Sequence, residues 1–179
     1  MKPVEPAPVK LICGILFSDK KRLADALEVL AERYGRIDYR SALYPFTITG
    51  YYNREMGVPI QRLFVAFEPL ISPGALAGIK IACNALEEAL AVSGLRKVNL
   101  DPGYIDYDKL VLASAKYNAH KIYLDQGIYA DPTLHFEKGA YLAAPWAFPD
   151  FKSGLYNADF LRIRARYKGQ LRRQRAASE

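Results

Sequence analysis

The sequence has few of the residues that bind metals or form disulfides. It contains two cysteines and two histidines in 179 residues, and neither a CxxC nor an HxxxH spacing occurs. A structural zinc site takes four such ligands at close spacing, so we expect no metal site. Cys13 lies in an apolar run and Cys83 on the apolar stripe of an expected helix, and we interpret both as small core residues.

Long apolar runs and the common catalytic motifs are also missing. No run approaches the roughly 18 residues that span a bilayer. The first ten residues contain three prolines instead of the apolar core of a signal peptide. We therefore expect a cytoplasmic protein without a membrane segment. No P-loop, GxGxxG, GxSxG or HExxH motif is present, which argues against the enzyme classes that carry them.

Positive charge is concentrated toward the end of the sequence. The net charge is +6, yet a late segment holds seven of the 25 basic residues with no acidic residue between them. These residues are Arg162, Arg164, Arg166, Lys168, Arg172, Arg173 and Arg175. The remaining sequence has 18 basic and 19 acidic residues and is therefore nearly neutral, so a nucleic-acid-binding surface over the whole protein is not indicated. The segment is either a solvated end or an RNA contact.

The first hundred residues alternate between strand and helix patterns. Continuous apolar runs rich in β-branched residues predict buried strands, and apolar residues three and four apart predict helices. The expected elements are strands at residues 9–17, 36–46, 60–68 and 96–100, and helices that begin at Ser18 or Asp19 and at Ser72-Pro73. This β-α-β-β-α-β order predicts an α+β fold with a ferredoxin-like split βαβ core, in which two helices cover one face of an antiparallel sheet.

The rest of the sequence predicts an extension of that core. We expect a short helix over residues 106–116, a three-stranded meander within residues 120–144, and a final helix from about Tyr156. Pro132 interrupts the middle strand of the meander, which is therefore shortened, bulged or at an edge. The expected division of the chain is a flexible segment at residues 1–8, one α+β domain at residues 9–168, and a basic, disordered tail at residues 169–179.

One motif resembles that of a known family. Residues 99–104 read Asn-Leu-Asp-Pro-Gly-Tyr, which resembles the NLDPGY signature of a prokaryotic family called domain of unknown function 4416. Further similarity lies around Tyr51-Tyr52 and in residues 109–114, 120–124 and 146–150. The resemblance extends over most of residues 8–167, and it implies no particular activity.

The Asp101-Pro102-Gly103 sequence within this motif fits a β-turn, with proline at the second position and glycine at the third. In one interpretation Asp101 only holds the turn. In the other, the turn exposes Asn99, Asp101 and Tyr104 and offers its backbone amides, Gly103 included, to an anion.

The leading hypothesis is a site for a small anionic ligand, such as a nucleotide or a phosphorylated metabolite. It would lie between this turn, the aromatic loop at Tyr51 and the expected hairpin from His120 to Tyr129. His120 is the candidate proton-transfer group, because an unperturbed histidine titrates near pH 6.5; the alternative is a structural histidine. The candidate ligand-binding residues are Tyr51, Tyr52, Glu55, Asn99, Asp101, Gly103, Tyr104, Lys109, Lys116 and Tyr129.

Two other functions remain open at this point. One is a non-catalytic RNA-associated protein that uses the C-terminal arginines. The other is a scaffold that acts through an oligomeric interface, for which an exposed sheet edge would be the structural sign. Lys80 and Asn84, one turn apart on the second helix, either belong to a solvated face, which we favour, or reach a ligand over the sheet edge. No cofactor is indicated.

Overall fold

The apolar run near the start of the sequence forms the centre of the sheet. In the computed structural model, which describes residues 2–177, strand β1 (Val9–Phe17) has nine residues and all are buried. Helix α1 (Lys20–Tyr34) follows, and the Asp19 carboxylate accepts hydrogen bonds from the N–H groups of Lys21 and Arg22 at its start. The predicted strand, cap and helix are confirmed here.

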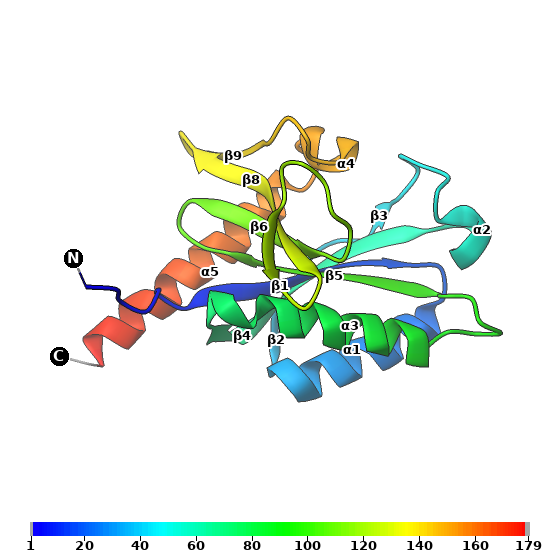
Figure 1. Ribbon diagram of the computed structural model, residues 1–179, viewed down its shortest axis with the longest axis horizontal. Coiled ribbons are helices and arrows are strands. Elements are labelled where there is room, and N and C mark those ends of the chain that lie inside the picture. Colours follow the sequence, from blue (N-terminus) through cyan, green and yellow to red (C-terminus); the bar gives the residue numbers. More distant parts are fainter. Residues whose placement is uncertain (1, 178–179) are drawn as a thin grey trace.

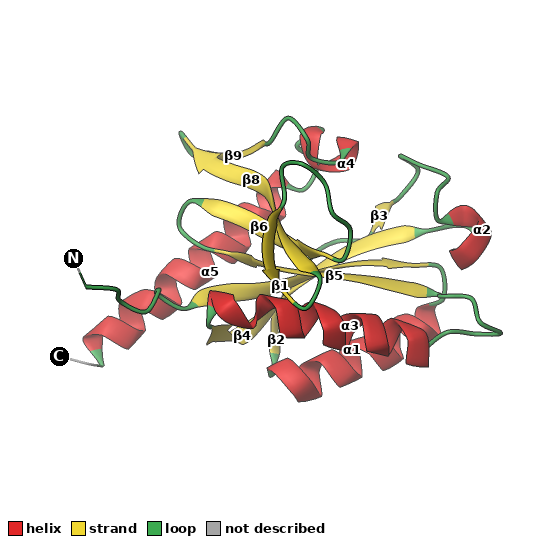
Figure 2. Cartoon of the chain, viewed as in Figure 1, coloured by secondary structure: helices red, strands yellow, loops and turns green. Residues whose placement is uncertain are grey.

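The described residues form an α+β structure with nine strands and five α-helices (Figures 1 and 2). The other strands are β2 (Ile37–Arg40), β3 (Tyr44–Pro45), β4 (Gln61–Ile71), β5 (Val98–Ile105), β6 (Lys109–Ser114), β7 (Ile122–Asp125), β8 (Ile128–Glu137) and β9 (Ala140–Ala143). The other helices are α2 (Asn53–Met56), α3 (Leu76–Ala89), α4 (Pro149–Lys152) and α5 (Asn157–Ala176), and a 3₁₀ turn (Pro73–Ala75) precedes α3.

All nine strands belong to one antiparallel sheet. Its order is β2-β4-β1-β5-β6-β8-β7, with β3 paired to β4 and β9 paired to β8. The strand expected at residues 36–46 is therefore two short strands, both on β4. The expected meander is present as β7, β8 and β9, and the register of β8 shifts next to Pro132, so that strand is bulged.

Helices cover both faces of the sheet. Leu11, Cys13 and Ile15 of β1 pack with side chains of α1 and α3, which lie together on one face (Figure 2). Ile12 of β1 lies in a second cluster with Phe160 of α5, on the opposite face. Because side chains alternate along a strand, the buried β1 supplies one core to each helical layer. No helix in the described part of the chain is long and apolar enough to cross a membrane.

The predicted turn at Asp101-Pro102-Gly103 is wrong, because these residues lie inside β5. Asp101 pairs with Gly14 and Gly103 with Ile12 across the β1–β5 ladder. Backbone N–H and C=O groups of successive residues point alternately to the two sides of a strand. The nitrogen of Pro102 points away from β1, so its missing N–H group removes no hydrogen bond of the β1–β5 ladder. Pairing with the buried central strand overrides the local turn preference.

The helix predicted over residues 106–116 is also wrong. Asp106 accepts hydrogen bonds from the N–H groups of Asp108 and Lys109 at 2.8 Å, and closes the hairpin between β5 and β6. The same side-chain chemistry caps a helix and holds a turn. The apolar residues of β6 that follow, Leu110 to Ala113, are buried as part of the sheet.

The final helix does not end at Gly169, where the sequence analysis placed the start of a disordered tail. Helix α5 continues to Ala176. Tyr167 and Leu171 are buried on either side of Gly169, and the Tyr167 hydroxyl donates a hydrogen bond to the carbonyl oxygen of Pro8. Packing of the helix against the body of the protein thus extends past the glycine.

Gly103 is required by the close approach of β5 and β6. A Cβ atom there would lie 2.4 Å from the Val111 carbonyl oxygen and 2.8 Å from Leu112 Cδ2. We expect Gly103→Ala to lower the free energy of unfolding by about 1–3 kcal/mol, measured by urea denaturation. The control is Gly78→Ala on the exposed side of α3, where a Cβ meets nothing within 4 Å. It should raise stability by about 0.5–1 kcal/mol. Equal effects of the two changes would contradict this account.

Candidate functional site: a cleft between strands β5 and β6

Strands β5 and β6 separate after a short stretch of pairing, and a cleft lies beside the place where they part. Their ladder covers only Gly103 to Ile105 on β5. Before Pro102, the edge of β5 that faces away from β1 has no strand partner in the described structure. The cleft, with a volume of about 680 Å³, is lined by residues of β5, the end of β6, helix α3, the loop at Phe46–Tyr52 and the α4 segment. We call it the β5–β6 cleft.

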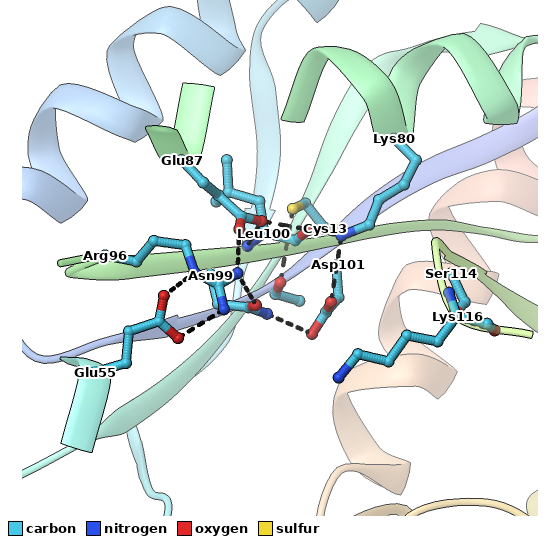
Figure 3. A network of polar contacts seen from close by, with 11 residues as sticks. Cys13, Glu55, Lys80, Glu87, Arg96, Asn99, Leu100, Asp101, Ser114 and Lys116 are labelled. Carbon is cyan, nitrogen blue, oxygen red and sulfur yellow. Dashed lines mark hydrogen bonds and ion pairs between the residues drawn. The ribbon is translucent and has the colours of Figure 1, made fainter. Parts of the chain in front are cut away.

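Helix α3 supplies the hydrogen bonds that a neighbouring strand would otherwise provide. Lys80 Nζ donates to the Leu100 carbonyl oxygen, and the Leu100 N–H donates to Glu87 Oε1, each at 2.7 Å (Figure 3). Lys80 and Glu87 are seven residues apart, so they project from the same side of the helix. Both side chains are buried, and the backbone of Leu100 is satisfied on its open edge.

Arg96 connects this pair of contacts to the loop that carries α2. Its guanidinium donates two hydrogen bonds to the Glu55 carboxylate, at 2.5 and 2.8 Å, and one to Glu87 Oε2 at 2.6 Å. A fourth hydrogen bond reaches Asn99 Oδ1 at 3.2 Å. Because Arg96 presents its donors in a rigid plane, it holds the three acceptor residues at defined positions.

Asn99 and Asp101 close the network on the β5 side. The Asn99 amide donates to Asp101 Oδ2 at 3.0 Å, and Lys80 Nζ lies 3.6 Å from Asp101 Oδ1 (Figure 3). We refer to the linked set Glu55, Lys80, Glu87, Arg96, Asn99 and Asp101 as the Leu100 network. Predicted site residues from β5 and from the α2 loop thus belong to one polar structure beside the cleft.

Burial and hydrogen bonding shift the pKa values of the acids here in opposite directions. The hydrogen bond from Arg96 lowers the pKa of Glu55 below its ordinary value. Burial raises the pKa of Glu87, although Lys80, the Leu100 amide and Arg96 act against that rise. Burial also raises the pKa of Tyr52 to about 12, helped by the nearby Asp101 carboxylate.

Lys116 stands on the other side of the cleft. Its ammonium donates a hydrogen bond to the Tyr51 hydroxyl at 3.2 Å and lies 4.8 Å from the centre of that ring. Figure 3 shows the side chain extending from the end of β6 toward the Leu100 network. Within residues 2–177, Lys116 forms no ion pair with a carboxylate, whereas Lys80, Arg96 and Lys121 all do. Its charge is therefore available to a ligand.

His120 lies behind the cleft wall. His120 Nε2 is 3.4 Å from Asp131 Oδ1, and Lys121 Nζ is 3.5 Å from Asp131 Oδ2. The imidazole stacks on Trp146 with ring centres 4.9 Å apart. Asp131 and Lys121 line the cleft, while His120 adjoins it through Asp131. Lys121 also donates to Ser114 Oγ at 2.8 Å.

The structure brings together some of the predicted residues and not others. Tyr51, Tyr52, Asn99, Asp101 and Lys116 line the cleft, and Glu55 holds Arg96 beside them.

Besides Glu55 and His120, which adjoin the cleft, four candidates do not line it. Gly103 serves the close packing of β5 on β6. Tyr104 packs on the cluster at the start of α3, Lys109 pairs with Asp106 at 2.5 Å, and Tyr129 contacts the rings of Tyr117 and Tyr123. Alternation along β5 directs Tyr104 to the face opposite that of Asn99 and Asp101, and Lys109 and Tyr129 lie on other strands.

The candidate ligand-binding residues did not include Arg62, Lys80, Glu87 or Arg96, which line the cleft. Of the two alternatives for Lys80, the solvated face is wrong, because the residue is buried and lines the cleft. The available signal was the spacing of Lys80 and Glu87, two charges of opposite sign two helical turns apart beside the apolar stripe of α3. Arg62 lies on the same side of a buried strand as Phe64 and Ala66, and a charge among such apolar residues is unusual.

The chain belongs to the family described as Domain of unknown function (DUF4416), whose model matches residues 7–167. That match includes every residue of the Leu100 network and of the cleft. No curated protein and no solved structure matches the chain. In the part of the chain that the structure describes, no group of three or more potential metal ligands is found.

The C-terminal arginines make contacts within the protein. Arg164 lies over the Phe136 ring and donates to the Tyr107 carbonyl oxygen, and Arg166 lies over the Tyr39 ring. Arg172, Arg173 and Arg175 are exposed. An RNA contact through these arginines stays a prediction, which salt-dependent binding of single-stranded RNA would test.

The ion pair between Glu55 and Arg96 should make stability depend on pH. Since the pKa of Glu55 is lowered from 4.5 in the folded protein, its contribution is present above pH 4.5 and is lost as the pH falls through the lowered value. We expect Glu55→Gln to cost about 1 kcal/mol or less at pH 7, because the pair is partly exposed. In urea denaturation, the difference from wild type should shrink at pH 3.

Glu88→Gln is the matched control, because Glu88 also lines the cleft but is exposed and forms no ion pair within the described residues. It should leave stability unchanged at both pH values. A Glu55→Gln penalty that is the same at pH 7 and pH 3 would show that the charge of Glu55 does not stabilise the fold.

Proposed function

We propose that the β5–β6 cleft binds a small anionic ligand, such as a nucleotide or a phosphorylated metabolite. The observation that carries the proposal is the position of Lys116, an ammonium on the cleft wall without a carboxylate partner in residues 2–177. Tyr51 holds this ammonium in place, so little ordering is required when an anion binds.

The size and lining of the cleft support a ligand of this kind. A volume of about 680 Å³ is within the range of roughly 300–1,000 Å³ that is typical of small-molecule sites. Tyr51 and Phe148 line the cleft and remain largely exposed, so aromatic surface is available to a planar group. Apolar walls with a few fixed polar groups are the usual composition of such sites.

The Leu100 network would orient the ligand. Asn99 and Asp101 line the cleft, and their hydrogen bonds and ion pair fix their side-chain positions before any ligand arrives. Such prior ordering favours tight and specific binding. His120, which adjoins the cleft through Asp131, stays the proposed proton-transfer group if the bound ligand reacts.

The strand order supports a ferredoxin-like core as a further proposal. The strands β1, β2, β4 and β5, with α1 and α3 between them, follow the β-α-β-β-α-β order in sequence. In the sheet they lie as β2-β4-β1-β5 with antiparallel neighbours, and both helices pack on one face. A split βαβ arrangement has this geometry. On this proposal the cleft lies where β6, β8 and β7 are added to the core.

A cytoplasmic location is likewise proposed. Its support is that Cys13 and Cys83 are both free and lie in the same buried cluster. Burial, together with contact between the two thiols, raises the pKa of Cys13 well above its ordinary value. Neighbouring thiols that stay reduced are typical of a reducing compartment.

The proposal is tested by thermal unfolding with adenosine monophosphate as the probe. At about 100 times its dissociation constant the nucleotide should add about 2.7 kcal/mol of stability. For a chain of this size that corresponds to a rise of about 5–10 °C in the unfolding midpoint. Lys116→Gln should weaken binding by about tenfold, or about 1.4 kcal/mol, because it removes a charge-assisted contact.

The control variant is Lys21→Gln, an exposed lysine on α1 outside the cleft. It should leave both the midpoint and the nucleotide affinity unchanged. The proposal would be wrong if no nucleotide or phosphorylated compound raised the midpoint of the wild-type protein, or if the two variants bound the nucleotide equally well.

A further inference from the structure

We infer that the part of the β5–β6 cleft formed by Arg62 is a carboxylate-binding subsite, and that the ligand carries its carboxylate on an apolar or aromatic body. The inference rests on the proposed function, because it concerns the ligand of the same cleft. Its basis is a buried guanidinium that lines the cleft and whose Nε has no hydrogen-bond partner within residues 2–177.

Arg62 is a charged residue on a buried strand. It lies on β4, on the same side of that strand as Phe64, and is 6% exposed. Its contact with a charged partner is an ion pair, in which Nη1 lies 3.3 Å from Asp150 Oδ2. Within residues 2–177 the guanidinium donates no hydrogen bond, and Nε is buried without a partner.

Aromatic rings surround this guanidinium. The centres of the Phe46, Phe151 and Phe64 rings lie 4.9, 5.4 and 5.6 Å from Arg62 Cζ, and the Tyr156 ring lies at 5.9 Å. Rings can satisfy the flat faces of a guanidinium, but its five N–H groups point outward in its own plane. Hydrogen-bond acceptors are therefore needed at the edges. The three phenylalanine rings have none, and the Tyr156 hydroxyl donates its hydrogen bond to Asp150.

A buried donor without an acceptor is unfavourable, because it has lost its hydrogen bonds to water and gained nothing in return. In a residue that lines an open cleft, the acceptor can come from a ligand. The fork of donors on an arginine matches the two oxygens of a planar oxyanion, which accept two parallel hydrogen bonds. The edge of Arg62 formed by Nε and Nη2, on the other side from the Nη1 group that pairs with Asp150, is thus suited to a bidentate oxyanion.

The local charge selects a monoanion over a dianion. Arg62 and Asp150 together carry no net charge, so a bound carboxylate leaves the subsite with one negative charge and a phosphate dianion leaves it with two. Both side chains are nearly buried, at 7% and 3% exposure, so the excess charge is poorly screened by water. The apolar side chains Leu112, Phe148 and Phe151 line the same cleft and suit an apolar body beside the carboxylate.

The experiment compares three ligands that share a ring and differ in the head group: phenylacetate, phenylacetamide and phenyl phosphate. Isothermal titration of each into the wild-type protein should give the tightest binding for phenylacetate, with the amide and the phosphate weaker by at least tenfold. In Arg62→Lys, phenylacetate should bind at least tenfold more weakly. A lysine keeps the charge but cannot present two parallel donors.

Two further variants keep the test informative. Arg62→Met combined with Asp150→Asn removes both members of the buried pair, so no unpaired charge is left to unfold the protein, and it should abolish phenylacetate binding. Arg36→Lys alters an exposed arginine that is paired bidentately with Glu68, and it should leave binding unchanged. Thermal unfolding and circular dichroism establish that each variant is folded.

The outcomes separate this inference from the proposed function. Phenyl phosphate binding as tightly as phenylacetate would overturn the carboxylate subsite, as would unchanged affinity in Arg62→Lys. If none of the three compounds binds while adenosine monophosphate binds in a Lys116-dependent manner, the carboxylate subsite is wrong and the proposed function stands. If the nucleotide also fails to bind, both are wrong.

Discussion

The structure depends on how the open edge of β5 is satisfied. A strand that leaves its neighbour exposes backbone N–H and C=O groups, and burying them without partners would be costly. Lys80 of α3 donates a hydrogen bond to the Leu100 carbonyl oxygen, and Glu87 accepts one from the Leu100 N–H. Asp101 neutralises the charge of Lys80, and Arg96 neutralises that of Glu87. Removal of either α3 residue would leave a buried charge or a buried backbone group without a partner. The position of α3, the separation of β5 from β6 and the cleft all follow from this arrangement.

The same arrangement explains why the cleft is polar on one side and apolar on the other. On the β5 side each described acid and base is engaged within the Leu100 network. Two cations elsewhere in the lining have few polar partners. Lys116 has no carboxylate partner in residues 2–177, and the described contacts of Arg62 are one ion pair and a set of aromatic rings. An anionic ligand with an apolar part would complete both. The rigid network and the unsatisfied cations together are what a binding site requires.

Much of the fold could be predicted because side-chain patterns carry it. The continuous apolar run of β1, the cap at Asp19 and the periodic stripe of α3 each indicated the right element. The errors came where one local signal serves two structures. Asp101-Pro102-Gly103 has turn chemistry but pairs with β1, and Asp106 closes a hairpin with hydrogen bonds that would equally start a helix.

The site was predicted in part. Tyr51, Asn99 and Lys116 are unusual in their local sequence. Lys80 and Arg62 also carry a local signal, but their contacts with Leu100 and Asp150 are set by tertiary structure. The most direct test of the central claim is a map of ligand-induced changes in the backbone amide resonances of the ¹⁵N-labelled protein. When the protein is titrated with adenosine monophosphate or with phenylacetate, the amide resonances of residues 51–52, 99–101 and 114–121 should shift. Those of α5 should not change. Shifts confined to α5 or to the outer edge of β7 would place binding elsewhere and contradict the assignment of the cleft.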